Sequence, residues 1–566
     1  MKQSSLHDRL LASKKDHLHP ISEGSSTKDT LLNFYNEELR DLHNEARHFS
    51  QKHPEVAHAL GLEENSVTDP MMNHLMQSFA FMGARLQQQA KDGQNKLIKS
   101  LLKLSAPHLE HPYPAMSIVQ LTPKSKEGLE LIPKGSPLIL KSKSHKISEF
   151  MTGYSTQLNN IEILKLGYEP SGKEGLLKLM LKNSGASPKN IRFFINLPLS
   201  SALKLHGHFF ENLKCFNFRS ENYELCLKAD SLKAVGFLED DCLLHYPGQV
   251  LEGHKLCNEF FAYPWRFLFF ELDLSGGEIS PSDLMYLEFH FYEYEAEFSS
   301  MLSERSLVLN CVPIINRYKQ MAEPILASDK NTYPLLLNNN HSILTHIEKV
   351  QALTKTGDEL NFHPLFYTEA SKLKTPYWEL NRLAVSDTLN EQYSLKIHTD
   401  KTDLRLLHVE LYCCDQNAAK EIVMQETHSL IFKHSSLSNS ISIRALTELT
   451  EYRAALIHSS NPHQLAKHLN INYLLPEEET LDNLLALMKL YNQHQHPALD
   501  ILIEAMLELN TSKETSRGMD GSAFVKKKVC IKLTKKSIHS FHLMKKLIQT
   551  LLADYSLLEV SVETRS

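Results

Sequence analysis

The sequence predicts a multidomain α+β protein, in which an N-terminal helical bundle-forming unit precedes β-rich domains and a small C-terminal α/β domain. Early apolar residues recur three and four positions apart, which is a helical spacing. Short β-branched and aromatic runs follow Pro114, and a strand–helix–strand pattern closes the chain. At 566 residues the chain is too long for one core. We expect a flexible tail at 1–27, a helical oligomerisation unit at 28–114, a β-rich domain at 115–335, a second mixed β domain at 336–440 and a C-terminal α/β domain at 441–566.

The composition is that of an ordinary globular protein. Hydrophobic residues make up 42% and charged residues 23%, and the net charge of −6 does not favour nucleic acid. No apolar run reaches the length of about eighteen residues that spans a bilayer. The N-terminus lacks the apolar core of a signal peptide. We therefore expect a cytoplasmic protein without direct membrane insertion.

The N-terminal helices are predicted to bind partners. From Lys28 the apolar residues alternate in the a/d pattern of a helix–helix seam, which Pro54 interrupts. Gly61 is placed to end a short turn. A second helix is predicted to open at 68–70, and a third to follow Gly93. Two or three helices alone make a poor hydrophobic core. We therefore predict a partner interface that contains Leu32, Tyr35, Leu39, Leu42, Phe49, Met72, Met76 and Phe79.

Strands are predicted wherever short apolar runs alternate or lie between turn residues. The predicted strands cover 117–121, 129–132, 191–197, 287–291 and 407–413. The end of the chain, 521–562, pairs a strand, a helix and a last strand.

The aromatic-dense segment 236–274 is predicted to serve packing. A strand buried on both faces is expected to start at Phe267, and Glu259 beside it is expected to be a satisfied structural carboxylate. The predicted core residues are Phe260, Phe261, Pro264, Phe267 and Phe269.

No catalytic, cofactor-binding or metal-binding residue is predicted. Pairs of histidines with metal-like spacing occur at 17/19, 108/111, 206/208, 494/496 and 539/542, but none accompanies Cys or carboxylate ligands. Acid–base catalysis is not predicted for the acidic pair 240–241, because adjacent carboxylates point in different directions. The acidic run 477–479 is better explained as charges at the N-terminus of a helix. The eight cysteines form no C-x-x-C pair and are expected to be reduced.

One charge bias stands out near the C-terminus. Residues 521–566 contain nine Lys or Arg and three Asp or Glu. No aromatic residues interleave with them as a nucleic-acid stacking platform requires. A solvated face or contact with an acidic partner is therefore the favoured interpretation, with no nucleic acid bound.

Several blocks resemble one family in its order along the chain. The run Glu259-Phe260-Phe261, with Pro264, Phe267 and Phe269, is similar to a signature of the TssF (VasA/ImpG) family of type VI secretion baseplate subunits. Further blocks lie at 34–39, 68–85, 307–325 and 465–491. The chain departs from the family where Ala106 replaces a tyrosine and where Arg317-Tyr318 replaces Leu-Phe.

The resemblance implies a structural wedge subunit rather than an enzyme. It implies assembly with TssG-like, TssK-like and TssE-like proteins and a second copy of the chain around a VgrG spike. It also implies docking at the inner face of the cytoplasmic membrane through the machine, and rearrangements that trigger sheath contraction. A baseplate wedge protein of a phage tail or tailocin is the alternative. A carbohydrate-active enzyme would need paired carboxylates in a cleft, and a nucleic-acid binder would need salt-sensitive binding.

Overall fold

The computed structural model describes most of the chain. The described residues are 27–62, 69–124, 130–141, 147–185, 189–220, 223–246, 250–274, 284–328, 330–337, 342–365, 376–384, 391–400, 403–421, 430–433, 441–459, 465, 480–492, 496–504, 506–517, 523–534, 541–553 and 558–565. They form two compact units, one containing residues 27–100 and the other the described residues from 101 onward. The predicted tail lies outside the described residues except for Thr27.

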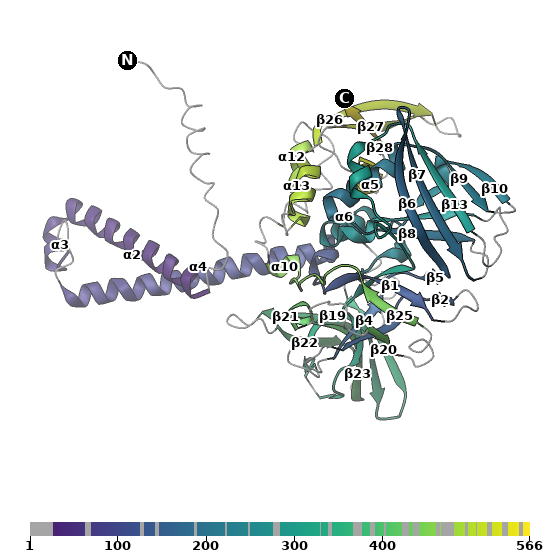
Figure 1. Cartoon of the computed structure of the whole chain (residues 1–566). Helices are drawn as coiled ribbons and strands as arrows, with labels where there is room; N and C mark the ends of the chain where they lie inside the picture. The colour runs from purple at the N-terminus through teal and green to yellow at the C-terminus, as the bar shows by residue number, and fades with distance from the viewer. Residues whose placement is uncertain are drawn as a thin grey trace, which may run out of the picture. The chain divides into compact units, whose positions relative to one another are not determined.

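The first unit is helical, as the sequence predicts. It contains α2 (Thr27–Lys52), α3 (Pro54–Ala59) and most of α4 (Pro70–Ser105). Figure 1 shows α2 and α4 as long helices with α3 between them in the chain. The break predicted at Gly93 is wrong, because α4 runs through it as one helix of 36 residues. A single exposed glycine costs a helix only about 1 kcal/mol, and the Gln, Ala and Lys residues around it favour helix.

The second unit is built mainly from sheets, and each sheet joins distant parts of the sequence. The six-stranded sheet has the order β24 (Leu430–Phe432), β3 (Pro137–Lys141), β4 (Ile147–Thr152), β15 (Cys311–Ile315), β1 (Met116–Pro123), β25 (Ile441–Ala445). The five-stranded sheet has the order β10 (Tyr223–Lys228), β9 (Leu213–Ser220), β13 (Leu284–Phe291), β7 (Glu174–Asn183), β6 (Ile161–Ser171). The four-stranded sheet has the order β11 (Leu232–Ala234), β12 (Phe269–Asp273), β8 (Asn190–Ile195), β14 (Leu307–Leu309).

The largest sheet has eight strands. Its order is β16 (Tyr318–Met321), β23 (Leu404–Asp415), β19 (Ser342–Thr354), β20 (Glu359–Pro364), β21 (Tyr377–Ala384), β22 (Glu391–His398), β18 (Thr332–Leu335), and β17 (Ile325–Leu326) also pairs with β23. A two-stranded sheet pairs β2 (Glu130–Ile132) with β5 (Thr156–Leu158). Strands on both sides of residues 335 and 440 thus share sheets. The four predicted domain boundaries remain a prediction.

The C-terminal strand–helix–strand prediction is confirmed. The last sheet has the order β26 (Met506–Arg517), β27 (Ala523–Thr534), β28 (Leu558–Arg565), and α14 (Phe541–Ala553) connects the parallel pair β27 and β28. The other helices of this unit are α5 (Leu199–Glu211), α6 (Glu252–Ala262), α7 (Ala296–Met301), α8 (Ala418–Glu421), α10 (Leu456–Ser459), α12 (Thr480–Tyr491) and α13 (Pro497–Glu504). Short 3-10 turns occupy Pro107–Glu110, Ala229–Ser231, Glu239–Asp241 and Pro264–Phe267.

Helix α14 packs closely on α6. A Cβ placed on Gly253 of α6 would lie 2.2 Å from Cα of Leu551 in α14, so only glycine allows this approach. At the other end of α14, His542 stacks on Phe210 of α5 with ring centroids 4.6 Å apart. The C-terminal segment therefore completes the core around the aromatic-dense segment.

Candidate partner-binding surface

The chain between α3 and α4 is fixed by local backbone and capping contacts. Gly61 adopts a positive φ of 66°, which glycine tolerates best, and ends the short turn as the sequence predicts. The carboxylate of Asp69 accepts a hydrogen bond from the backbone N–H of Met71 at 2.9 Å, and Pro70 is the first residue of α4. The predicted cap is confirmed at Asp69, while Thr68 lies outside the described residues.

One face of α4 is held against α2 by few contacts. Gln87 donates a hydrogen bond to the carboxylate of Glu38, and the ammonium of Lys91 lies 5.2 Å from the ring centroid of Phe34. Ala80 and Ala84, on the same side of α4 as Gln87, are fully buried. The first half of α2 is therefore tied to the middle of α4.

A second face of α4 is apolar and open to solvent. Its residues are three, four or eleven positions apart, so they lie along one side of the helix. We call this set the outer stripe; its members, with their exposed fractions, are Met71 (78%), Leu75 (50%), Phe79 (56%), Met82 (59%), Leu86 (64%) and Leu97 (63%). A soluble protein seldom exposes so many large apolar side chains in a row unless another molecule covers them.

The predicted interface residues fall into three groups in the structure. Leu32 is 54%, Phe49 38% and Phe79 56% exposed, so these three are open to a partner. The half-buried members are Tyr35, Leu39, Leu42 and Met72. Met76 is 8% exposed and belongs to the interior of the first unit. The prediction therefore puts all eight residues on one surface, whereas the structure divides them between the open face and the interior of the first unit.

The predicted interface includes Phe79 but leaves out the other five members of the outer stripe. Of the predicted residues on α4, Met76 lies about a quarter of a turn from the axis of the stripe. The stripe can be identified from the sequence by following the apolar residues at intervals of three and four from Met71 through Leu86. Whether this surface binds a partner remains a prediction.

The aromatic-dense segment is confirmed as core. Phe260, Phe261, Phe267 and Phe269 are at most 1% exposed, and Pro264 is buried. The strand expected from Phe267 is corrected, because β12 begins two residues later, at Phe269. Residues 264–267 form a 3-10 turn instead, since Pro264 suits the first position of a helical turn.

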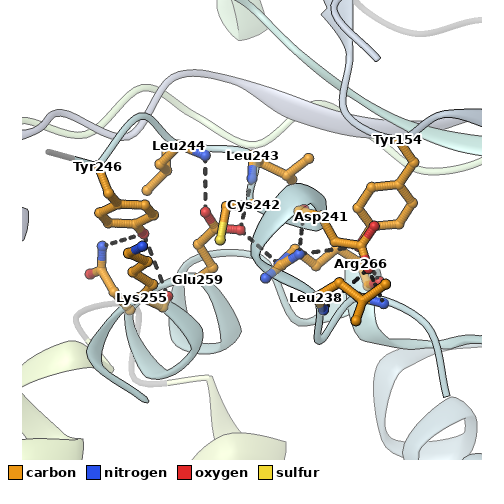
Figure 2. Close-up of polar contacts among 12 residues, drawn as sticks. Tyr154, Leu238, Asp241, Cys242, Leu243, Leu244, Tyr246, Lys255, Glu259 and Arg266 are labelled. Carbon is orange, nitrogen blue, oxygen red and sulfur yellow. Dashed lines mark hydrogen bonds and ion pairs between the residues drawn. The ribbon is translucent and has the colours of Figure 1, made fainter. Parts of the chain in front are cut away.

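Figure 2 shows Glu259 between the backbone of Leu243 and Leu244 and the side chain of Arg266. Its two carboxylate oxygens accept hydrogen bonds from the backbone N–H groups of Leu243, at 3.0 Å, and Leu244, at 2.9 Å. The guanidinium Nε of Arg266 lies 2.8 Å from the same carboxylate, and both side chains are at most 2% exposed. The prediction of a satisfied structural carboxylate is confirmed.

Arg266 is held from several sides. Its Nη1 donates to the backbone carbonyl of Asp241 at 2.7 Å and to the hydroxyl of Tyr154 at 3.2 Å, and its guanidinium carbon lies 4.1 Å from the ring centroid of Phe267. Burial alone lowers the pKa of Arg266, but the Glu259 carboxylate, Tyr154 and Cys242 together outweigh burial and raise that pKa above its ordinary value. Buried charges with this many partners are typical of structural ion pairs.

The histidine pairs do not converge on a metal site in the described part of the chain. Within it, no group of three or more His, Cys, Asp or Glu side chains is arranged to hold an ion. His108 instead contacts the Tyr491 hydroxyl at 2.8 Å, and His254 contacts the same hydroxyl at 3.0 Å. His17, His19, His494 and His539 lie outside the described residues.

Two further observations bear on surface predictions. The side chains of the C-terminal lysines around 526–528 lie outside the described part, so their predicted role is untested. Among the described helices, none is long and apolar enough to cross a membrane.

Comparisons with known proteins agree on one family. The model of the family described as "Type VI secretion system, TssF" matches residues 27–564. The type VI secretion system component TssF1 of Pseudomonas aeruginosa strain PAO1 is 24% identical over 543 residues, which cover 86% of this chain and 87% of that protein.

Two solved structures share the fold. A chain of a TssK-TssF-TssG baseplate subcomplex, determined by cryo-electron microscopy, gives a TM-score of 0.71 at 17% identity and covers 87% of this chain and 96% of its own. A chain of a type VI secretion baseplate complex gives a TM-score of 0.60 at 16% identity and covers 94% of this chain and 96% of its own.

Proposed function

The chain belongs to the TssF family of type VI secretion systems, and on this premise we propose that it is a structural wedge subunit of a type VI secretion baseplate. The shared fold with chains of two baseplate complexes supports the proposal. The observation that carries it in this molecule is the outer stripe, because an apolar helix face of this length is what a helical bundle with partner subunits would cover.

The partners follow from the proposal. TssG-like and TssK-like proteins are the first, since a similar fold occurs in a TssK-TssF-TssG subcomplex. A second copy of this chain, a TssE-like protein and a VgrG spike complete the proposed assembly. The outer stripe, with the exposed Leu32 and Phe49, is the proposed surface for helices of the TssG-like protein or of the second copy.

The proposed mechanism is mechanical and not enzymatic. The Glu259–Arg266 pair is buried, and both oxygens of its carboxylate accept backbone hydrogen bonds, so the pair stiffens the core instead of meeting a substrate. Partner contacts on the first unit would hold the closed baseplate, and their rearrangement would trigger sheath contraction. The assembly would act at the cytoplasmic face of the inner membrane, to which the machine docks.

Composition of the purified complex tests this function. We would co-express the chain with the gene products encoded beside it and weigh the particles by native mass spectrometry. The proposal predicts a particle that contains two copies of this chain with one TssG-like protein. A chain that stays alone while the TssG-like and TssK-like proteins bind each other would refute it.

A further inference from the structure

Two cysteines lie on neighbouring antiparallel strands, β9 and β10, of the five-stranded sheet (Figure 1). Cys215 on β9 is opposite Lys228, and Cys226 on β10 is opposite Asn217. Cys226 is therefore a diagonal neighbour of Cys215, and the two side chains lie on the same face of the sheet. That face is the outer one, because Cys226 is exposed and Cys215 is half-buried, whereas Phe216 on the other face is fully buried.

The two thiols contact each other. Burial raises the pKa of Cys215, and the charge of Cys226 and a hydrogen bond between the two side chains raise it further. The diagonal register is unfavourable for a disulfide, since diagonal neighbours have Cα atoms about 7–8 Å apart and a disulfide usually needs about 4.4–6.8 Å. A bridging metal ion suits the pair better, because two metal–sulfur bonds of about 2.3 Å let the sulfurs lie up to roughly 4.6 Å apart.

The surroundings of the two thiols limit which ion they suit. His290 on β13 is opposite Cys215, but its Nε2 lies 3.3 Å from Nδ2 of Asn217, so the imidazole already has a partner. In the described part of the chain, no three His, Cys, Asp or Glu side chains are arranged to hold an ion. Structural zinc sites need four ligands. Thiolates favour soft ions, of which Cu(I) is stable with two thiolates in line.

The charges beside the thiols are compatible with a bound Cu(I). Lys228, directly opposite Cys215, is exposed on the same face. Glu224, also on β10, is paired with Arg219 at 2.8 Å. Two thiolates and one Cu(I) carry a single negative charge together, and the ammonium of Lys228 can offset that charge.

We propose that Cys215 and Cys226 form a two-coordinate binding site for a soft monovalent metal ion, Cu(I). Each thiol loses its proton to water, and each sulfur forms one bond to the copper. The copper stays Cu(I) throughout, so the step needs no oxidant or reductant. The bound ion would tie β10 to β9. This site lies on the second unit and goes beyond the wedge function, which concerns the outer stripe.

Competition for Cu(I) tests the proposal on the full chain. The reduced protein is titrated without oxygen against bicinchoninate, a chelator that changes colour when it binds Cu(I). We expect the unmodified chain to retain about one Cu(I). Cys215→Ser and Cys226→Ser should each weaken binding by roughly a hundredfold or more, because the second bond then no longer forms within the same molecule. The control His290→Gln keeps both thiols and should bind Cu(I) as the unmodified chain does.

A second reagent tests the closeness of the thiols without copper. Phenylarsine oxide bridges two neighbouring thiols, since its arsenic forms one bond to each sulfur while its oxygen leaves as water. Intact mass spectrometry of the folded chain should show one such adduct, and neither serine variant should form it. Melting temperatures of the variants show that each is folded when it is labelled.

Three results would overturn the proposal: full transfer of copper from the unmodified chain to the chelator, unchanged Cu(I) affinity in both serine variants, or a loss in His290→Gln as large as theirs. The last would mean that the ion has a third ligand. All these measurements use the isolated chain, so they do not depend on assembly. A chain that binds Cu(I) through both thiols but joins no baseplate complex would refute the wedge function alone.

Discussion

At the scale of single residues, Glu259 shows how burial turns a charged residue into a structural one. Its place beside an aromatic run already predicts a satisfied carboxylate, because an unpaired charge would not persist there. The identity of its partners could not be predicted. Leu243 and Leu244 supply backbone groups, and the buried charge of Arg266 is visible only once the 3-10 turn is known.

We predict that Glu259→Gln strongly destabilises the protein. Removing one charge leaves Arg266 buried without its counter-ion, which typically costs about 3–5 kcal/mol. Urea unfolding of the full chain measures this. Glu224→Gln removes a carboxylate that is 59% exposed from an ion pair with Arg219, which is 60% exposed, and should change stability little. Equal effects of the two variants would contradict the structural role of Glu259.

The aromatic core gives a second prediction. Phe269 is fully buried, and its ring lies 4.8 Å from that of Phe194. Phe269→Ala should lower the free energy of unfolding by about 3–5 kcal/mol through lost burial and a new cavity. Tyr292→Ala, at a position 58% exposed, is the control and should change it little. A Phe269→Ala variant that kept its stability but lost its partners would place this ring at an interface.

Because His254 is buried, we predict that the stability of the protein depends on pH. Burial lowers its pKa to about 4, below its ordinary value of 6.5. Since the unfolded chain then binds a proton more readily than the folded one, stability falls as the pH drops from about 6.5 towards 4. Between pH 7 and pH 5 this residue should account for about 2 kcal/mol. Unfolding measured at both pH values should show that His254→Gln loses less stability than the unmodified chain, by that amount. An equal loss of stability in the two proteins would mean that His254 titrates normally.

At the scale of elements, local patterns predicted element type better than element length. The C-terminal strand–helix–strand and the N-terminal helices follow from periodicity alone. The continuity of α4 through Gly93 could not be predicted, since a glycine signals a break but does not enforce one. The start of β12 at Phe269 depends on the turn made by the preceding residues. Sheet order could not be predicted either, because it joins strands such as β1 and β25 that lie hundreds of residues apart.

Gly93 offers a test of α4 itself. A Cβ at this position would meet no atom within 4 Å, so Gly93→Ala should stabilise the helix by about 1 kcal/mol. Hydrogen exchange of the α4 amides around it should slow by about fivefold. Gly253→Ala is the opposite case, because its Cβ would collide with Leu551. Faster exchange in the Gly93→Ala variant would argue for a break at this position.

At the scale of the whole molecule, the account rests on the outer stripe as the surface that partners cover. The predicted interface set mixes two faces of these helices, because a/d spacing alone does not say which face α2 and α4 bury against each other. Leu39 and Leu42 illustrate this, since both are half-buried and their substitution would disturb the first unit as well as a partner. Phe79 and Met82, at 56% and 59% exposed, do not carry that ambiguity.

The most direct measurement is therefore capture of the co-expressed TssG-like protein by a Phe79→Asp/Met82→Asp variant. Its control, His74→Asp, places an aspartate at an exposed polar position of α4, roughly 0.3 of a turn from the axis of the outer stripe. Both variants should keep the circular dichroism and melting temperature of the unmodified chain. We predict that the control captures the partner normally and the stripe variant captures at least tenfold less, because charge would be buried at the bundle interface. Normal capture by a folded stripe variant would contradict the account.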